Sequence, residues 1–305
     1  MIQPQLLREG SRVALVATAR KVSPDEVRPA IDLLRSWQLE PVVDEGLYAT
    51  DNQMAGDDIH RAALLQQYLD DDSIDAILCV RGGYGTVRIV DRINFQSLEQ
   101  HPKWIIGYSD VTVLHSHIVG HCQLCTLHAT MPLNIPADPS QWHTPAITTL
   151  RRALFEGRVD IDAPASPLNR QGCCKAPVVG GNLSVLYSLI GSASDVDTDG
   201  KILFIEDLDE YLYHIDRMMQ NLRRSGKLER LAGLAVGALS DMHDNTIPFG
   251  KQAEEIVLDA VNDYHYPVAF HLPVGHIGLD NQALLIGATA TLDINDKKTH
   301  LSQSC

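Results

Sequence analysis

The sequence predicts an α/β fold in two units, the first of which is a parallel sheet with helices on both faces. The chain has 305 residues, 45% of them hydrophobic, which suffices for two medium-sized domains with packed cores. Short apolar strands alternate with helical patterns through the first half, as they do in parallel sheets. Prolines gather at 132–145 and again at 162–167, where they indicate loops. We therefore expect domains at 1–160 and 173–305, joined by a linker at 161–172.

Local patterns predict the elements of the first unit. A strand at 12–18 is followed by Ser23-Pro24-Asp25-Glu26, in which Ser is a helix N-cap, Pro takes the first helical position and Glu the third. The resulting helix reaches about residue 37. Further strands are expected at 41–43, 74–80 and 104–108, and further helices at 57–69, 111–119 and 144–154.

The second unit begins near Cys173 and is less regular. Its expected helices lie at 183–190, 213–224 and 251–262. Its expected strands lie at 201–205, at 234–239, near 268 and within 283–292.

The charge and the apolar runs of the chain argue against two classes of partner. A formal net charge of −14 disfavours nucleic acid or an anionic membrane as the main partner. No apolar run approaches the ~18 residues that span a bilayer. The apolar run 13–19 is followed at once by Arg20 and Lys21, so we expect a buried first strand there and not a signal peptide. A cytoplasmic protein is therefore expected.

The cysteines raise the question of a metal site. There are six of them: Cys79, Cys122, Cys125, Cys173, Cys174 and Cys305. They show no disulfide framework, but Cys122 and Cys125 form a Cys-x-x-Cys motif near four histidines, which zinc could use. The motif lies in an expected strand at 122–127, where residues three apart face opposite ways, and there is no second Cys-x-x-Cys. We therefore expect structural cysteines and no metal.

Three side chains suited to hydrolytic chemistry follow predicted strands, where functional groups of α/β sheets gather. Ser109, two residues after Gly107, stands at a strand-to-helix turn that resembles a nucleophile elbow. A serine at such a place is also a good helix N-cap, so both roles are open. His276 could act as the base of this serine, and Glu206 could orient the histidine. Asp207 competes with Glu206 for that role.

The segment Arg81-Gly82-Gly83-Tyr84-Gly85 follows another predicted strand. Glycines there let the backbone approach a ligand and offer N–H groups to an oxyanion, although a purely structural turn is the alternative. The segment matches neither a Walker motif nor G-x-G-x-x-G, so nucleotide binding has weak support. Arg81 has two open roles, contact with a substrate carboxylate or contact with an internal acid.

Taken in order, these motifs resemble the LD-carboxypeptidase family, the muramoyltetrapeptide carboxypeptidases. The similarity runs over nearly the whole chain, and seven ordered matches at suitable spacing make a specific combination. The matching segments are 80–85, 106–110, 127–132, 180–183, 204–207, 215–218 and 275–276.

The resemblance implies an N-terminal α/β domain and a C-terminal domain of β/β/α type, with the active site between them. It implies a triad in which Ser109 is the nucleophile, His276 the base and Glu206, not Asp207, the acid. Separately from the resemblance, we expect backbone N–H groups near Gly83 and Asp110 to stabilise the oxyanion, and Tyr84 and Arg81 to contact the substrate. No metal or organic cofactor is implied.

The reaction implied by the resemblance is hydrolysis of the bond between the L-centre of a diamino acid and the terminal D-alanine of a murein tetrapeptide. This reaction serves cell-wall recycling and passes through an acyl-enzyme on Ser109. A homodimer is plausible for the family. The related microcin-immunity peptidases use the same triad on aminoacyl-nucleotide amides, but the modest length of this chain favours the murein branch. A non-catalytic protein that binds muropeptides is a third hypothesis.

Overall fold

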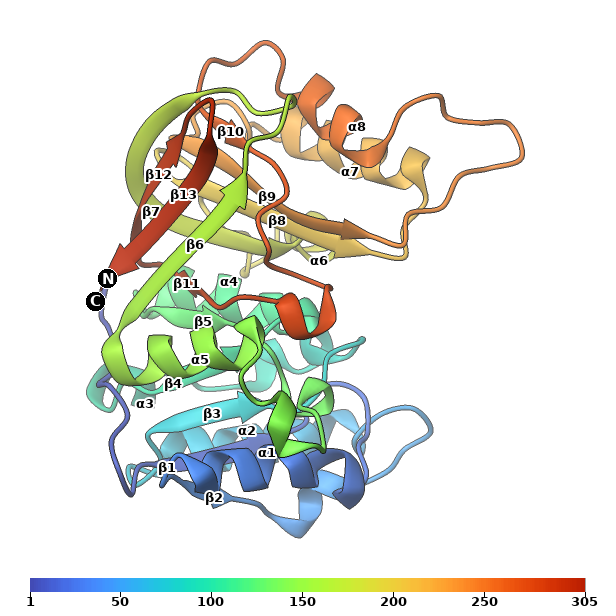
Figure 1. The fold of residues 1–305 in the computed structure, drawn as a ribbon. Coiled ribbons are helices and arrows are strands. Elements are labelled where there is room, and N and C mark those ends of the chain that lie inside the picture. The colour runs from blue at the N-terminus through green and yellow to red at the C-terminus, as the bar shows by residue number, and fades with distance from the viewer. Residues whose placement is uncertain (305) are drawn as a thin grey trace.

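Two β-sheets, one above the other, form the framework of the protein (Figure 1). The computed structural model describes residues 1–304, so Cys305 lies outside the described residues. The strands of the described range are β1 (Arg12–Val16), β2 (Glu40–Val42), β3 (Ala76–Cys79), β4 (Trp104–Gly107), β5 (Thr126–His128), β6 (Arg158–Pro164), β7 (Gly172–Asn182), β8 (Ile202–Leu208), β9 (Gly233–Ser240), β10 (Val268–Ala269), β11 (Leu284–Ile286), β12 (Thr289–Ile294) and β13 (Lys298–Ser304). Its α-helices are α1 (Pro24–Ser36), α2 (Asp58–Asp70), α3 (Ser97–Gln100), α4 (Thr112–His121), α5 (Pro145–Glu156), α6 (Leu183–Leu189), α7 (Leu212–Arg224) and α8 (Ala253–Ala260).

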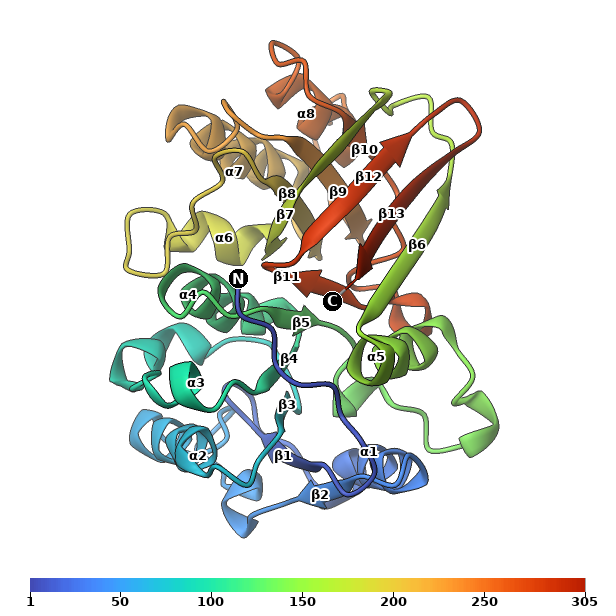
Figure 2. The same ribbon diagram turned by 90° about the vertical axis from the view of Figure 1, so that its left-hand side faces the viewer.

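The first sheet has the strand order β2-β1-β3-β4-β5-β11. Its neighbours from β2 to β5 pair in parallel, which confirms the predicted arrangement of the first half. Helices α1 and α5 cover one face, and α2, α3 and α4 cover the other (Figure 2). Strands such as β3 are therefore buried on both faces, which explains why they form continuous apolar segments in the sequence.

Helix α1 follows its sequence signals closely. The Ser23 side chain accepts a hydrogen bond from Glu26 N, and Ser23 N donates to Glu26 Oε2 over 2.7 Å. This is the predicted capping box. The helices predicted at 57–69 and 144–154 are present as α2 and α5. Across residues 1–304, no helix is long and apolar enough to cross a membrane.

The second sheet has the strand order β10-β9-β8-β7-β12-β13-β6. Strands β7 to β10 pair in parallel, whereas β7, β12, β13 and β6 pair antiparallel. The sequence did not predict β6, β7 or β13. Strands β6 and β13 carry many polar residues and alternate in burial, and β7 contains a proline and three glycines, which are uncommon within strands. Residues 161–164, expected in a linker, form the end of β6. The domain limits 1–160 and 173–305 stay a prediction.

Strand β11 links the two halves of the chain. The sequence placed one stretch of strand at 283–292, but the structure divides it into β11 in the first sheet and β12 in the second. Gly287, with φ of +92°, lies between them and permits the change of direction. Because β11 pairs antiparallel with β5, the first sheet is parallel except at this edge.

The two halves meet where α4 packs on the end of β7. Asn182 N donates to Thr112 Oγ1 over 3.0 Å. A Cβ atom on Gly181, whose φ is +149°, would lie 2.5 Å from the same oxygen, so this approach requires glycine. The contact fixes the carboxyl end of β4, which leads into α4, against the carboxyl ends of β7 and β8.

Candidate active site

Ser109 lies in a tight turn between β4 and α4. Its φ of +63° is in the left-handed region, which a non-glycine residue rarely adopts. Gly107 lets the turn close, because a Cβ atom there would lie 2.9 Å from Val111 Cγ2. The N-cap residue is Tyr108 for the 3-10 turn Ser109–Val111 and Val111 for α4. The helix-cap role considered for Ser109 is therefore wrong, and the turn has the form of a nucleophile elbow.

An acid and a histidine from the second half form a short hydrogen bond. Glu206 lies near the end of β8 and is fully buried, and His276 lies in the loop that follows β10. His276 Nδ1 donates to Glu206 Oε2 over 2.6 Å. Because Nδ1 is engaged, Nε2 is the ring nitrogen left to exchange a proton.

The loop around His276 is held on both sides of the histidine. Gly275, with φ of +121°, permits the close approach, because a Cβ atom there would lie 2.7 Å from Glu206 Oε2. Gly275 N donates to Asn281 Oδ1 over 2.8 Å, and Ser240 Oγ donates to the His276 carbonyl over 2.9 Å. These contacts, together with Glu206, set the position of the imidazole ring.

The acids Glu206 and Asp207 are adjacent in sequence but face different partners. The register of β8 against β9 shifts between Ile205 and Asp207, so that Glu206 is opposite two residues of β9. Asp207 accepts hydrogen bonds from Asn182 Nδ2 over 2.9 Å and from Ser184 N over 2.8 Å. The acid that contacts His276 is thus Glu206, while Asp207 holds the start of α6.

Burial and charge shift the ionisation of these groups. Burial opposes protonation of His276, but the hydrogen bond and charge of Glu206, with the charge of Asp207, outweigh it and raise the pKa of His276 above its usual value. Burial, and then the charge of Glu206, raise the pKa of Asp207 to about 7, despite the hydrogen bonds that this carboxylate accepts. The local field therefore favours an imidazolium at His276.

Ser109 and His276 line one pocket of about 450 Å³, to which both halves of the chain contribute. We call it the interdomain pocket. From the first half it is lined by Arg20, Arg81, Gly82, Gly83, Tyr108, Ser109, Met131, Leu133 and Asn134, and from the second by Asn182, Ser184, Val185, Asp207, Leu208, Asp209, Glu210 and His276. The rings of Tyr108 and His276 are 4.8 Å apart between centroids, so the residue before Ser109 contacts the histidine.

The glycine segment 81–85 lies directly beside Ser109. A Cβ atom on Gly82 would be 3.0 Å from Ser109 Cβ and 3.2 Å from Ser109 Oγ. Gly83, the next residue, lines the interdomain pocket and has φ of +110°. The glycine segment therefore packs against the Ser109 side chain, and the oxyanion role of its backbone N–H groups stays a prediction.

Two buried side chains anchor the glycine segment. The Asp110 carboxylate accepts a hydrogen bond from Thr86 N over 2.9 Å. Arg61, also buried, donates from Nη1 to Gly85 O over 3.0 Å. Burial raises the pKa of Asp110, although its hydrogen bonds with Thr86 lower it. The Asp110 side chain thus connects the Ser109 turn to the end of the glycine segment.

Arg81 contacts an internal acid, which was one of its two open roles. Its Nη1 donates to the Lys21 carbonyl over 3.2 Å and lies 3.6 Å from Glu26 Oε1. Tyr84 is exposed, interacts with Arg88 and lies outside the set of residues that line the interdomain pocket. Substrate contacts by Arg81 and Tyr84 stay predictions.

Comparison with known proteins gives the family of this chain. Residues 13–129 match the description LD-carboxypeptidase N-terminal domain, and residues 175–292 match LD-carboxypeptidase C-terminal domain. A probable murein peptide carboxypeptidase of Bacillus subtilis is 33% identical over 301 residues, which span 97% of this chain and 92% of the relative. The chain belongs to the LD-carboxypeptidase family. The resemblance inferred from the seven motifs is confirmed.

Solved structures share the fold of this LD-carboxypeptidase family member. The crystal structure of muramoyltetrapeptide carboxypeptidase from Oxalobacter formigenes has a TM-score of 0.86 at 23% identity, covering 97% of this chain and 99% of that chain. MccF, the microcin C7 self-immunity protein, solved in complex with glutamyl sulfamoyl guanosine, has a TM-score of 0.85 at 17% identity, covering 99% and 98%. These likenesses concern the fold, and they confirm the predicted two-domain α/β architecture.

Sequence reasoning missed several residues that line the interdomain pocket. Asn182 belongs to the matching segment 180–183, and its side chain caps α6 by accepting from Val185 N over 3.2 Å. Arg20 and Glu210 belong to no motif. Both follow strands of parallel pairs, β1 and β8, so the rule that functional groups gather at carboxyl ends could have indicated them.

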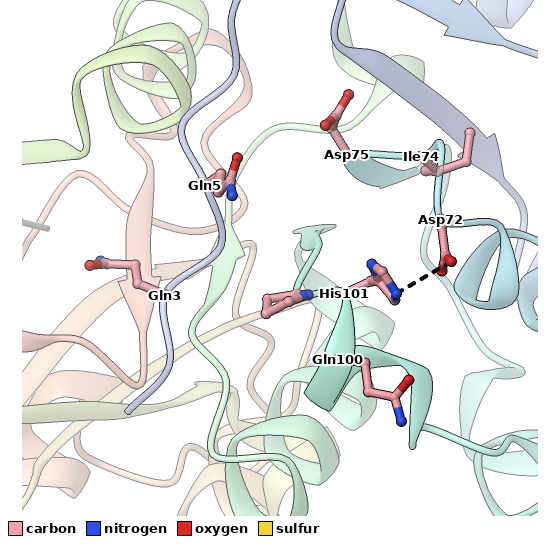
Figure 3. A pocket seen from close by; sticks show the side chains of 8 residues that line it. Gln3, Gln5, Asp72, Ile74, Asp75, Gln100 and His101 are labelled. Carbon is pink, nitrogen blue, oxygen red and sulfur yellow. Dashed lines mark ion pairs between the residues drawn. The ribbon is translucent and has the colours of Figure 1, made fainter.

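A second pocket lies beside the amino ends of β3 and β4, whereas Ser109 follows the carboxyl end of β4. Figure 3 shows the side chains that line it. We call it the amino-edge pocket; it has a volume of about 340 Å³ and is lined by Gln3, Gln5, Asp72, Ile74, Asp75, Gln100, His101 and Pro102. Its one ion pair joins His101 Nε2 to Asp72 Oδ2 over 3.3 Å. The lining contains no serine or cysteine, so it lacks the nucleophile that an LD-carboxypeptidase of the predicted serine type requires.

The Cys-x-x-Cys motif is not part of a metal cluster in the described part of the chain. Cys122 caps the C-terminus of α4 and Cys125 precedes β5, so the strand expected at 122–127 is confined to its end. Both cysteines are buried. Over residues 1–304, no group of three or more His, Cys, Asp and Glu side chains is placed to hold a metal ion.

Proposed function

We propose that this protein is a serine-type LD-carboxypeptidase that releases the terminal D-alanine of murein tetrapeptides in peptidoglycan recycling. The observation that carries the proposal is the 2.6 Å hydrogen bond between His276 Nδ1 and buried Glu206, in the same pocket as the left-handed turn of Ser109. Membership of the LD-carboxypeptidase family supports the reaction class. The relative from Bacillus subtilis, a probable murein peptide carboxypeptidase, supports the substrate class.

The proposed reaction proceeds in two steps. His276 Nε2 takes the proton of Ser109 Oγ, and the alkoxide attacks the carbonyl carbon of the bond to D-alanine. The bond to nitrogen breaks, His276 gives its proton to the departing amine, and an acyl-enzyme remains on Ser109. Water, deprotonated by His276, then attacks the ester and frees the shortened peptide and the serine hydroxyl. No metal or organic cofactor takes part in this scheme.

Each partner of the proposed nucleophile has a defined physical task. Glu206 holds His276 in the tautomer with the proton on Nδ1 and stabilises the imidazolium that forms during both steps. Backbone N–H groups of Gly83 and Asp110 are assigned to the oxyanion, because the glycine segment abuts Ser109. The shift of the His276 pKa to a higher value supports a base that accepts the serine proton readily.

The setting of the enzyme is also part of the proposal. A pocket of about 450 Å³ suits a small peptide. The negative net charge of −14 supports the expectation that neither nucleic acid nor a membrane is a partner. We place the protein in the cytoplasm as a homodimer, and cell fractionation and light scattering test these two statements.

The proposal is tested with defined murein tetrapeptides that carry different third residues, with products identified by mass spectrometry. We expect release of D-alanine by the native protein and a loss of roughly 10⁴-fold or more in kcat for Ser109→Ala with the fold retained. Ser140→Ala, at an exposed serine outside the pocket, is the matched control and should keep full activity. Full activity in Ser109→Ala would contradict the nucleophile assignment.

The likeness to MccF supports a second candidate, an amidase of the microcin-immunity type. Rates measured side by side on an aminoacyl-sulfamoyl adenosine and on a tetrapeptide separate the two enzymes. A non-catalytic muropeptide-binding protein, the third candidate, would bind the tetrapeptide without turnover and without covalent labelling of Ser109.

A further inference from the structure

We propose that Arg20 binds the terminal carboxylate of the substrate peptide in the interdomain pocket. This inference rests on the proposed carboxypeptidase function and adds the residue that recognises a free carboxyl terminus. The residue released by a carboxypeptidase carries its carboxylate next to the scissile bond. That charge must leave water on binding, so it needs a partner within the pocket.

The position of Arg20 is suited to this task. A Cβ atom on Gly83 would lie 2.7 Å from both Cδ and Nε of Arg20, so the arginine side chain lies across this glycine. The neighbouring Gly82 abuts Ser109, and Arg20, Ser109 and His276 all line the interdomain pocket. Only the glycine segment therefore separates the guanidinium-bearing side chain from the proposed nucleophile.

Arg20 is also the available cation of the pocket. The other lining arginine, Arg81, is engaged by the Lys21 carbonyl and lies near Glu26. The Arg20 side chain has no ion pair or hydrogen bond with any residue of the range 1–304. Its backbone, in contrast, is held by a bridge to Met54. A residue that binds a carboxylate needs a fixed backbone and a guanidinium that is free to form hydrogen bonds with the ligand.

The acids that the second half contributes to the pocket would help to orient the substrate. Asp209 and Glu210 line the second half of the interdomain pocket, each paired with a histidine, His243 and His214 respectively. A substrate carboxylate is repelled by these acids and attracted by Arg20, so its negative end should face the first half. The protein carries a net charge of −14, so Arg20 places a positive charge in the pocket of a protein that is negative overall.

This arrangement would make the enzyme selective for a free carboxyl terminus. A planar guanidinium can form two parallel hydrogen bonds with a carboxylate, and a carboxamide cannot accept both. A peptide amidated at its terminal D-alanine would keep every other contact and lose this one. The ratio of kcat/KM for the acid and for the amide therefore measures the proposed contact directly.

The experiment compares a murein tetrapeptide with its C-terminal carboxamide. We expect the native enzyme to prefer the acid by roughly 10- to 100-fold in kcat/KM, the range of a hydrogen-bonded charge. Arg20→Gln should lower kcat/KM on the acid by the same factor and leave the amide unchanged, and Arg20→Lys should recover part of the preference. Arg35→Gln, at an exposed arginine of α1, should keep the native ratio.

Calorimetric binding in a Ser109→Ala background separates this inference from the proposed function. If the native protein releases no D-alanine but Ser109→Ala binds the acid more tightly than the amide, and Arg20→Gln removes that difference, Arg20 is confirmed while the reaction is wrong. If the native protein turns over and Arg20→Gln keeps the acid preference, Arg20 is overturned and the reaction stands. Equal binding of acid and amide, or no binding, also overturns it.

Discussion

The two halves of the chain bring different kinds of structure to the candidate site. The first half supplies the Ser109 turn and the glycine segment 81–85, each of which contains residues with positive φ. The second half supplies Glu206 and His276, two ionisable groups joined by a short hydrogen bond. We infer from this comparison that backbone geometry positions the proposed nucleophile, whereas buried charge supports the proposed base. Changes in the two halves should therefore be distinguishable by their effects.

The strongest test of this comparison lies in the second half, at adjacent acids. Glu206→Gln should lower kcat by about 10⁴-fold, because an amide cannot stabilise the imidazolium and favours the wrong tautomer of His276. Asp207→Asn should stay within about tenfold of the native rate, because Asp207 contacts Asn182 and Ser184 and not His276. Steady-state kinetics on a tetrapeptide measure both. Equal losses in the two variants would contradict the assignment of the acid.

The two halves also differ in how well the sequence predicts their strands. Strands β1, β3 and β4 were predicted because each is an apolar run buried on both faces, and the capping box of α1 marked its first residue. Strand β7 was missed because it contains a proline and three glycines, which are uncommon within strands.

The sequence likewise predicted one part of the candidate site and not another. The three predicted residues Ser109, Glu206 and His276 come from short motifs, and the structure places two of them in one pocket and joins the third to His276. The left-handed φ of Ser109 and the place of Arg20 depend on contacts between segments that are distant in sequence. Such contacts leave no local pattern, so the sequence did not reveal them.

A second prediction concerns the contact that joins the halves. Gly181→Ala should lower kcat/KM by roughly 100-fold, because its Cβ would meet Thr112 and displace α4 and Ser109 from His276. The matched control is Gly191→Ala, which also has a positive φ but has open space around the added Cβ. The control should lose roughly 1 kcal/mol of unfolding free energy and keep kcat/KM. Kinetics and thermal unfolding of both variants show whether Gly181→Ala displaces Ser109 from His276 or only strains the backbone at the substituted glycine.

The third prediction concerns the pH dependence of kcat/KM, which is set by the ionisation of His276 in the second half. Since the proposed base must be neutral, kcat/KM should rise with pH, with a midpoint above about 6.5 because the pKa of His276 is raised. The stability that His276 contributes has the opposite sign: it is present below about pH 6.5 and is lost as pH rises through the folded-state pKa. Asp207→Asn should move the kinetic midpoint to lower pH, because the charge of Asp207 helps to raise that pKa. A midpoint unchanged in Asp207→Asn would contradict this electrostatic account.

The smallest effect is expected within the first half, at the amino-edge pocket. His101 and Asp72 form an ion pair of 3.3 Å with largely exposed side chains, so His101→Ala should cost less than about 1 kcal/mol of unfolding free energy. It should leave kcat/KM within about twofold, because this edge holds the amino ends of β3 and β4, whereas Ser109 follows the carboxyl end of β4. Kinetics and thermal unfolding on one preparation test both parts. A loss of more than about tenfold in kcat/KM would mean that the first sheet contributes to the reaction from both edges, and that the division between geometry and proton chemistry is incomplete.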